Sequence, residues 1–127
     1  SDYLEDKVLD HVFGGTAYTA PGTLYVGLYT AAPSDSGGGT EVSGGSYARK
    51  SMPAMTVSGT SPTEATNGAA VEFVTATGSW GTVTHVGVFD AVTTGNLLGW
   101  AALTASKTVS SGDVFRFDAG DLDITLA

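Results

Sequence analysis

The sequence predicts a single all-β domain, namely an antiparallel β-sandwich or jelly-roll-like barrel with one short N-terminal amphipathic helix. Apolar residues alternate with polar or small ones in several short segments, which is typical of half-buried strands. The connections between these segments are rich in turn formers and too short for helical crossovers, so we expect antiparallel neighbours. No shift in composition divides the 127 residues, and we expect one domain over residues 1–127.

The helix is expected at about residues 2–13. Its apolar stripe repeats every four residues and consists of Leu4, Val8 and Val12, widened by Leu9 and Phe13. Asp2 and Glu5 have the spacing of a capping box, and Gly14-Gly15 supplies the stop. Such a stripe must be buried, so we expect the helix either to cover an open end of the sheets or to dock on another subunit.

The strands follow in order. "TLYVGLYT" alternates Leu24, Val26 and Leu28 against Tyr25, Gly27 and Tyr29. "AAPSDSGGGTEVSGGS" is a long loop, and "YARKSMPAMTVSG" is a weak segment in which Pro53 favours an edge or a bulge. Further strands are expected in "AAVEFVTA", "TVTHVGVFDA", "LLGWAALTA", "DVFRFDAG" and "DLDITLA". In the last two, we expect Phe115, Phe117, Leu122, Ile124 and Leu126 to face inward.

Composition excludes several classes of function. The net charge of −8 repels phosphate backbones, which excludes nucleic acid as a partner. No apolar run is long enough for a membrane helix, and the acidic start after Ser1, which we expect to follow a removed Met, is unlike a signal peptide. The chain has no cysteine, so thiolate chemistry and cysteine metal sites are excluded. Charged residues are sparse, which favours faces that touch neighbouring subunits or an extracellular protein.

The residues that catalysis would need do not form a recognisable pattern. His85 lies on an apolar strand face and is expected to be packed, while Asp90 points to the opposite face. No nucleophile-elbow motif occurs. Glu72 and Asp90 lie on expected strands and are a candidate pair for glycoside hydrolysis, but nothing in their spacing brings them together. We therefore expect no enzyme and no cofactor.

Three further features of the sequence are candidates for metal, phosphate or sugar binding. "DAGDLD" clusters Asp118, Asp121 and Asp123 but lacks the pattern of a calcium loop, and solvated acids at a strand end explain it. The glycine-rich "SDSGGGTEVSGG" lacks the pattern of a phosphate loop. Trp80 and Trp100 are more typical of a core or an interface than of a sugar platform. No metal site is expected.

Four segments carry a resemblance to a known family: "LEDKVLDHVFGGTAYTAPGTLYVGLYTAAPSD", "GGTEVSGGSYARK", "ATGSWGTVTHVGVFDA" and "GNLLGWAALTASKTVSSGD". Over nearly its whole length the chain resembles a family of small tailed-bacteriophage virion proteins, often labelled tail fibre or minor structural proteins. The resemblance implies a compact β-fold without a cofactor and with surfaces for neighbours. Its motifs are structural, so it supplies no active-site residue.

Two roles follow from this resemblance. The first is a capsid decoration (cement) protein on the particle exterior, a homo-oligomer, expected as a trimer, seated between major capsid subunits. The second is a tail-associated or tail-fibre module that contacts other virion proteins and binds the host surface, with Tyr25, Tyr29 or Trp100 as the sugar-binding aromatics. Candidate interface residues for either role are Leu4, Val8 and Val12 on the helix, and Tyr47, Arg49 and Lys50 in a basic patch.

Overall fold

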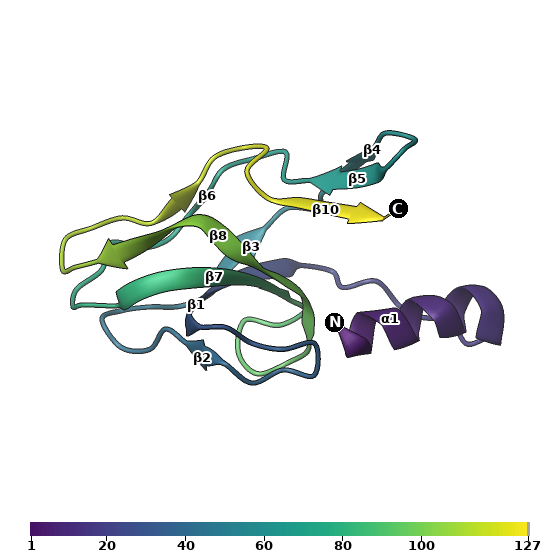
Figure 1. The fold of residues 1–127 in the computed structure, drawn as a ribbon, viewed down its shortest axis with the longest axis horizontal. Coiled ribbons are helices and arrows are strands. Elements are labelled where there is room, and N and C mark those ends of the chain that lie inside the picture. Colours follow the sequence, from purple (N-terminus) through teal and green to yellow (C-terminus); the bar gives the residue numbers. More distant parts are fainter. Residues whose placement is uncertain (127) are drawn as a thin grey trace.

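The computed structural model describes residues 1–126 and consists of two layers of β-structure with one protruding helix (Figure 1). The larger layer is an antiparallel sheet with the strand order β2-β1-β7-β8, in which β3 also pairs with β1. Its strands are β1 (Leu24–Ala31), β2 (Thr40–Glu41), β3 (Lys50–Met52), β7 (Gly81–Phe89) and β8 (Leu97–Val109). The predicted all-β sandwich is confirmed.

The second layer consists of two small sheets, one of which extends beyond the end of the larger sheet (Figure 1). One has the order β10-β5-β4 and the other pairs β6 with β9. The strands are β4 (Thr56–Ser58), β5 (Thr63–Thr66), β6 (Val71–Glu72), β9 (Arg116–Phe117) and β10 (Asp123–Leu126). Because β8 and β10 each end the order of their sheets, the sandwich is open at this side. The alternative of a closed jelly-roll-like barrel is therefore wrong.

The core lies between the two layers. From β1 and β7 it takes Val26, Leu28, Val83, Val86 and Val88, and from the opposite layer it takes Val71, Phe73, Phe115, Phe117 and Leu122. Phe115 and Phe117 face inward as the alternation predicts, while Val114 is 48% exposed. The middle of β1 is buried on both faces, because Glu41, Tyr47 and Phe89 cover Gly27, and Phe89 also stacks on Tyr29.

Helix α1 spans Asp2–Leu9 and continues into a π-helical turn, Asp10–Gly14, which ends at Gly15 in the left-handed conformation. The helix prediction of about 2–13 thus holds, but the predicted capping box is wrong. Ser1 is the N-cap, and its Oγ accepts a hydrogen bond from the amide of Leu4 at 3.3 Å. The same Oγ donates to the carbonyl oxygens of Leu97 and Leu98 and ties the helix to β8.

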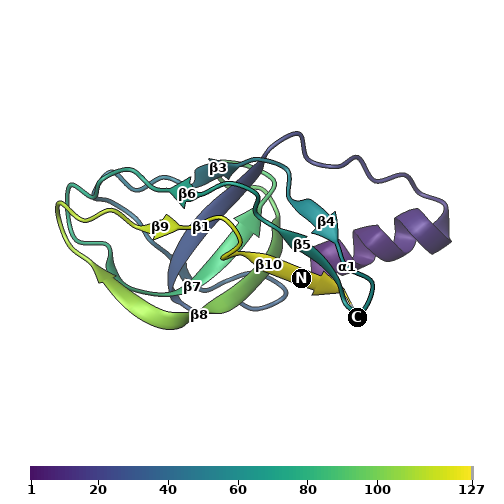
Figure 2. The ribbon, with the colours of Figure 1, turned by 90° about the horizontal axis from the view of Figure 1, so that it is seen from above.

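The helix does not bury its whole stripe. Leu4 packs against the core, whereas Val8 and Val12 are 42% and 61% exposed and Phe13 is 82% exposed. Figures 1 and 2 both show the helix extending away from the sandwich, at the end from which β4, β5 and β10 also extend. The expectation that the helix covers an open end of the sheets is therefore wrong within this chain.

The final strand also departs from its expected burial. Leu122 is buried, but Ile124 and Leu126 are 44% and 76% exposed. Strand β10 pairs with β5 beyond the point where the larger sheet lies opposite, so its inner face has no second layer to pack on. The prediction of one continuously buried face is wrong for these two residues.

Candidate functional site

The candidate catalytic residues are held in structural contacts. His85 is half-buried, its Nδ1 lies 2.8 Å from the hydroxyl of Thr84, and its ring lies 5.9 Å from that of Trp100. The carboxylate of Asp90 accepts two hydrogen bonds from Asn96 and so closes the β7–β8 turn. Glu72 forms an ion pair with Arg116 at 3.4 Å. Each acid thus has a different structural partner, and the structure does not join Glu72 to Asp90.

The acids near the C-terminus stabilise a turn. Asp118 accepts a hydrogen bond from Nε of Arg116 at 2.8 Å, and Asp121 accepts one from the amide of Asp118. Among residues 1–126, no group of three or more His, Asp or Glu side chains is placed to hold a metal ion. Across the same described range, no helix combines the length and the apolarity that crossing a bilayer requires.

Two residues of the predicted basic patch belong to a partly buried group, here called the Arg49 cluster and formed by Glu41, Tyr47, Arg49 and Phe89. Nε and Nη2 of Arg49 donate to the two carboxylate oxygens of Glu41 at 2.9 and 2.8 Å. Nη1 donates to the carbonyl oxygens of Ala91 and Thr94 in the β7–β8 turn. The guanidinium also lies 3.4 Å from the ring centre of Phe89. Such a planar, five-donor group suits this set of partners, and lysine would not replace it.

Tyr47 completes the β1 ladder. Strand β3 pairs with Leu24 to Val26, and β2 pairs with Tyr29 and Ala31, which leaves Leu28 between them. The hydroxyl oxygen of Tyr47 accepts a hydrogen bond from the Leu28 amide at 2.9 Å and donates to Glu41 at 2.7 Å. Burial raises the pKa of Tyr47 far above its usual value, the Glu41 carboxylate adds to this rise, and the Leu28 amide opposes it.

These contacts determine which of the predicted interface residues are exposed. The side chain of Arg49 is only 9% exposed, so Tyr47 and Arg49 are used inside the chain, and Lys50 alone of the basic patch is exposed. On the helix, Val8 and Val12 are exposed and Leu4 is not. Burial lowers the pKa of Arg49, but the contact with Glu41 outweighs it and the pKa lies above its usual value.

The aromatic candidates for sugar binding differ in how much of each ring is exposed. Tyr29 is 5% exposed and stacks on Phe89 with ring centres 6.2 Å apart. Trp80 is buried and donates its indole N–H to the carbonyl of Gly45. Trp100 is half-buried and donates its indole N–H to Asp35 at 3.0 Å. Tyr25 and Trp100 are thus the candidates that keep accessible ring surface.

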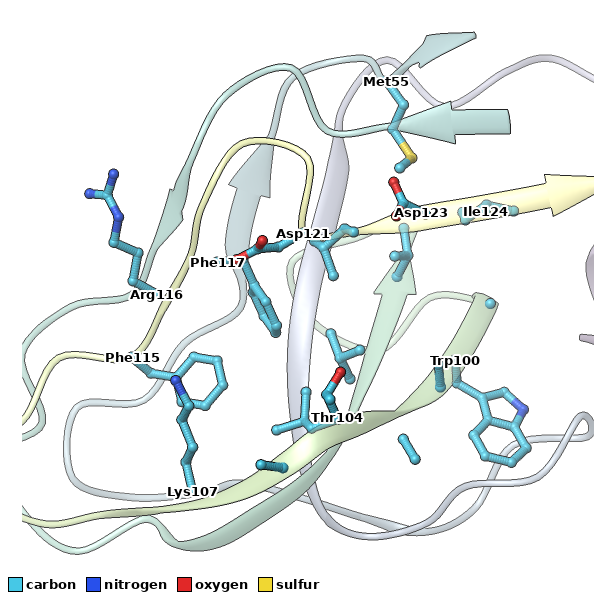
Figure 3. A pocket seen from close by; sticks show the side chains of 18 residues that line it. Met55, Trp100, Thr104, Lys107, Phe115, Arg116, Phe117, Asp121, Asp123 and Ile124 are labelled. Atoms are coloured by element: carbon cyan, nitrogen blue, oxygen red, sulfur yellow. The ribbon is translucent and has the colours of Figure 1, made fainter. Parts of the chain in front are cut away.

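A groove of about 520 Å³ lies at the open side of the sandwich (Figure 3). Strand β8 forms one wall, from which Trp100, Thr104 and Lys107 reach the groove. The segment from the residue before β9 to β10 forms the other wall, with Phe115, Phe117, Asp121, Asp123 and Ile124. Sequence reasoning missed this groove, although the alternation in "DLDITLA" marked one of its walls.

Arg49 and Arg116 bind turns and acidic side chains, and the described chain also presents strand edges and apolar side chains at its surface. The family model for podophage GP4 fiber I protein gp80 matches residues 1–125. The chain belongs to this family, which is one of phage virion structural proteins. The predicted resemblance to tailed-phage virion proteins is confirmed. A comparison with curated proteins finds no significant match.

Proposed function

We propose that this protein is a tail-associated structural component of a podophage virion, placed on the particle exterior as part of a fibre. The match of residues 1–125 to a fibre protein family carries this proposal. The acidic surface and the small size, which favour capsid decoration, agree equally well with a fibre component. The family description supports the tail-associated alternative more than the cement role, whose partner would be the major capsid protein.

The protein acts by binding neighbours and not by catalysis. Glu72 pairs with Arg116, and Asp90 accepts hydrogen bonds from Asn96, so the two carboxylates serve separate structural contacts. Contacts that form only in the assembled virion stabilise that assembly by mass action. The exposed residues Val8, Val12 and Phe13 of the helix supply an apolar surface for other virion proteins.

Labelling of purified virions tests the position. Gold-labelled antibodies against the protein are expected at the tail end of the particle, and quantitative mass spectrometry is expected to give far fewer copies than the major capsid protein. Label spread over the head, with copy numbers close to those of the capsid protein, would support decoration and overturn the tail assignment. Absence of the protein from purified virions would overturn both roles.

A further inference from the structure

A second hollow, of about 510 Å³, lies on the face of the larger sheet that is turned away from the core, and is here called the outer pocket. Three segments from distant parts of the chain form its rim: the start of helix α1, the loop between β1 and β2, and the loop between β7 and β8. The amide of Asp2 donates to the carbonyl oxygen of Asp35, which joins the first two segments beside the start of β8 (Figure 1). The volume is that of a site for a small ligand.

The floor of the outer pocket contains a buried hydroxyl without a partner. Tyr29 lines the pocket and is 5% exposed, and its side-chain hydroxyl forms no hydrogen bond with any residue from 1 to 126. Because no polar side-chain atom of the described chain is both unpartnered and sealed from solvent, this hydroxyl is open to the pocket. Burial raises the pKa of Tyr29, so the hydroxyl keeps its proton and can both donate and accept. A ligand group that pairs with it recovers the free energy that an unpartnered buried hydroxyl costs.

Arg49 supplies a donor beside this hydroxyl. A guanidinium group has five N–H bonds, of which Glu41 accepts two and the carbonyl oxygens of Ala91 and Thr94 accept one each. The remaining N–H bond belongs to Nη2 and has no acceptor within residues 1–126, and Arg49 lines the outer pocket. The positive charge is already balanced by Glu41. The floor therefore presents an N–H donor and a neutral hydroxyl.

Two carboxylates lie at the rim. Asp2 and Asp35 line the pocket and are exposed, and neither forms an ion pair within the described chain. One carboxylate oxygen of Asp35 accepts a hydrogen bond from the indole of Trp100 at 3.0 Å, and the other oxygen has no partner there. The rim thus presents acceptors, whereas the floor presents a donor and a hydroxyl.

These groups select a neutral ligand that carries several hydroxyl groups. Asp2 and Asp35 repel an anion. An ammonium group has no acceptor for the free N–H bond of Arg49, and its pairing with exposed carboxylates contributes little. A hydroxyl group donates to a carboxylate and accepts from an N–H bond, so neighbouring hydroxyls on one ring satisfy both rim and floor. We propose that the outer pocket binds one residue of a neutral saccharide.

NMR titration of the isotope-labelled free protein with glucose, galactose, mannose and N-acetylglucosamine tests this proposal. At least one of these sugars is expected to bind with a dissociation constant on the order of 1 mM. Its binding should shift the amide signals of Ser36, Gly37 and Asn96, which line the outer pocket. The amide signals of Thr104 and Asp123, which line the groove, should stay in place. No shift with any of the four sugars at about 100 mM would overturn the proposal, and so would shifts confined to the groove.

Charged probes test the class of ligand. The uronic acid form of the sugar that binds should bind at least about fivefold more weakly, because its carboxylate meets Asp2 and Asp35. Ethylammonium chloride carries a cation without a hydroxyl, and it should not shift the pocket amides at the same concentration. Binding of the uronic acid as tightly as the neutral sugar would overturn the assignment of a neutral ligand. So would saturable shifts with ethylammonium.

Two pairs of measurements separate ligand binding from a structural role. Tyr29→Phe removes only a hydroxyl that has no partner inside the chain, so thermal unfolding should occur at no lower temperature than in the native protein. The variant should nevertheless bind the sugar about fivefold to tenfold more weakly. Asp2→Asn should also weaken binding by about fivefold. Asp6→Asn is the matched control, because Asp6 is an exposed acid of the same helix outside the pocket, and it should bind as the native protein does. Unchanged affinity in Tyr29→Phe would overturn the proposal.

The saccharide residue can belong to a glycan of the host surface or to a free sugar in solution, and adsorption of virions to host cells distinguishes these sources. Slower adsorption in the presence of the binding sugar, and for virions that carry Tyr29→Phe, identifies a surface glycan. Unchanged adsorption in both cases overturns that source and identifies a free saccharide. Only this step rests on the proposed tail-associated position, which the labelling of virions tests separately, whereas binding itself is measured on the free protein.

Discussion

Gly27 and Gly87 lie directly opposite one another across β1 and β7, and the ring of Phe89 covers both of them. A Cβ atom built at Gly27 would lie 2.9 Å from the Phe89 ring and 2.9 Å from a carboxylate oxygen of Glu41. The ring has no space to move, because Arg49 lies against its face. The absence of two side chains thus makes room for the Arg49 cluster.

Gly27→Ala should lower the free energy of unfolding by about 1–3 kcal/mol, because the added methyl group overpacks the cluster. Gly99→Ala is the control: it lies in β8, where a Cβ meets nothing within 4 Å and where φ is not positive. Urea denaturation followed by tryptophan fluorescence measures both variants. Equal stability of the two variants would contradict the close approach of Phe89.

Arg49→Met should destabilise the protein by about 3 kcal/mol, because it leaves the half-buried Glu41 carboxylate without its cation. It also releases the carbonyl oxygens of Ala91 and Thr94. The double variant Arg49→Met with Glu41→Gln should cost less than the sum of the single losses, since the two groups interact directly. Denaturant titration of the four proteins gives this coupling, and simple additivity would speak against the contact.

The free energy of unfolding should decrease at alkaline pH because of the ionisation of Tyr47. Its pKa in the folded protein is raised above the usual 10.0 by burial, so above this pH the unfolded chain loses the proton and the folded chain keeps it. The stability from the neutral hydroxyl is therefore complete below pH 10 and declines as the pH rises further. Unfolding free energies at a series of pH values should show this decline.

Tyr47→Phe isolates the contribution of that hydroxyl. The variant should be less stable at neutral pH by about 1–3 kcal/mol, because the Leu28 amide loses its acceptor. It should also lose less stability above pH 10 than the native protein. Burial raises the pKa of Tyr29 as well, so a smaller alkaline decline should remain in the variant. An unchanged alkaline profile would exclude Tyr47 as its main cause.

Asn67 fixes the segment that leads into β10. It is 1% exposed, and its amide group donates to the carbonyls of Ala69 and Asp118 and accepts from the amides of Gly120 and Leu122. Asn67→Asp should destabilise the protein more than Asn67→Ala, since it places a carboxylate oxygen against two carbonyls. Hydrogen exchange of the Leu122 amide should accelerate in both variants, and unchanged exchange would contradict this role.

The sequence allowed the elements with a clear period to be predicted. The helix, β1, β7 and the inward side of Phe115 and Phe117 follow from alternation or helical spacing, because local side-chain pattern determines them. Burial could not be predicted for residues that lie beyond the region where the two layers overlap. Ile124 and Leu126 continue the alternation of a core strand, yet no sheet lies opposite them, and only tertiary structure defines where a layer ends.

The Arg49 cluster was not predictable for a related reason. Arg49 and Lys50 are adjacent and equally basic in the sequence, and this pattern predicts one surface patch. The structure turns Arg49 inward, where its partners lie 8 to 45 residues away in the chain. The local sequence gives no information about partners that lie so far away in the chain. The groove was missed similarly, because its two walls, β8 and β10, meet only through the packing of separate sheets.

The attachment of Ser1 to β8 sets a temporal order on folding. The bonds from its hydroxyl reach residues 96 and 97 positions further along the chain. During synthesis, the helix therefore has no docking site until the ribosome has released Leu97 and Leu98. Contacts of such wide sequence separation also slow folding, because a large loop must close before they form. Helix α1, which precedes every strand of this fold in the sequence, is thus one of the last elements to reach its final place.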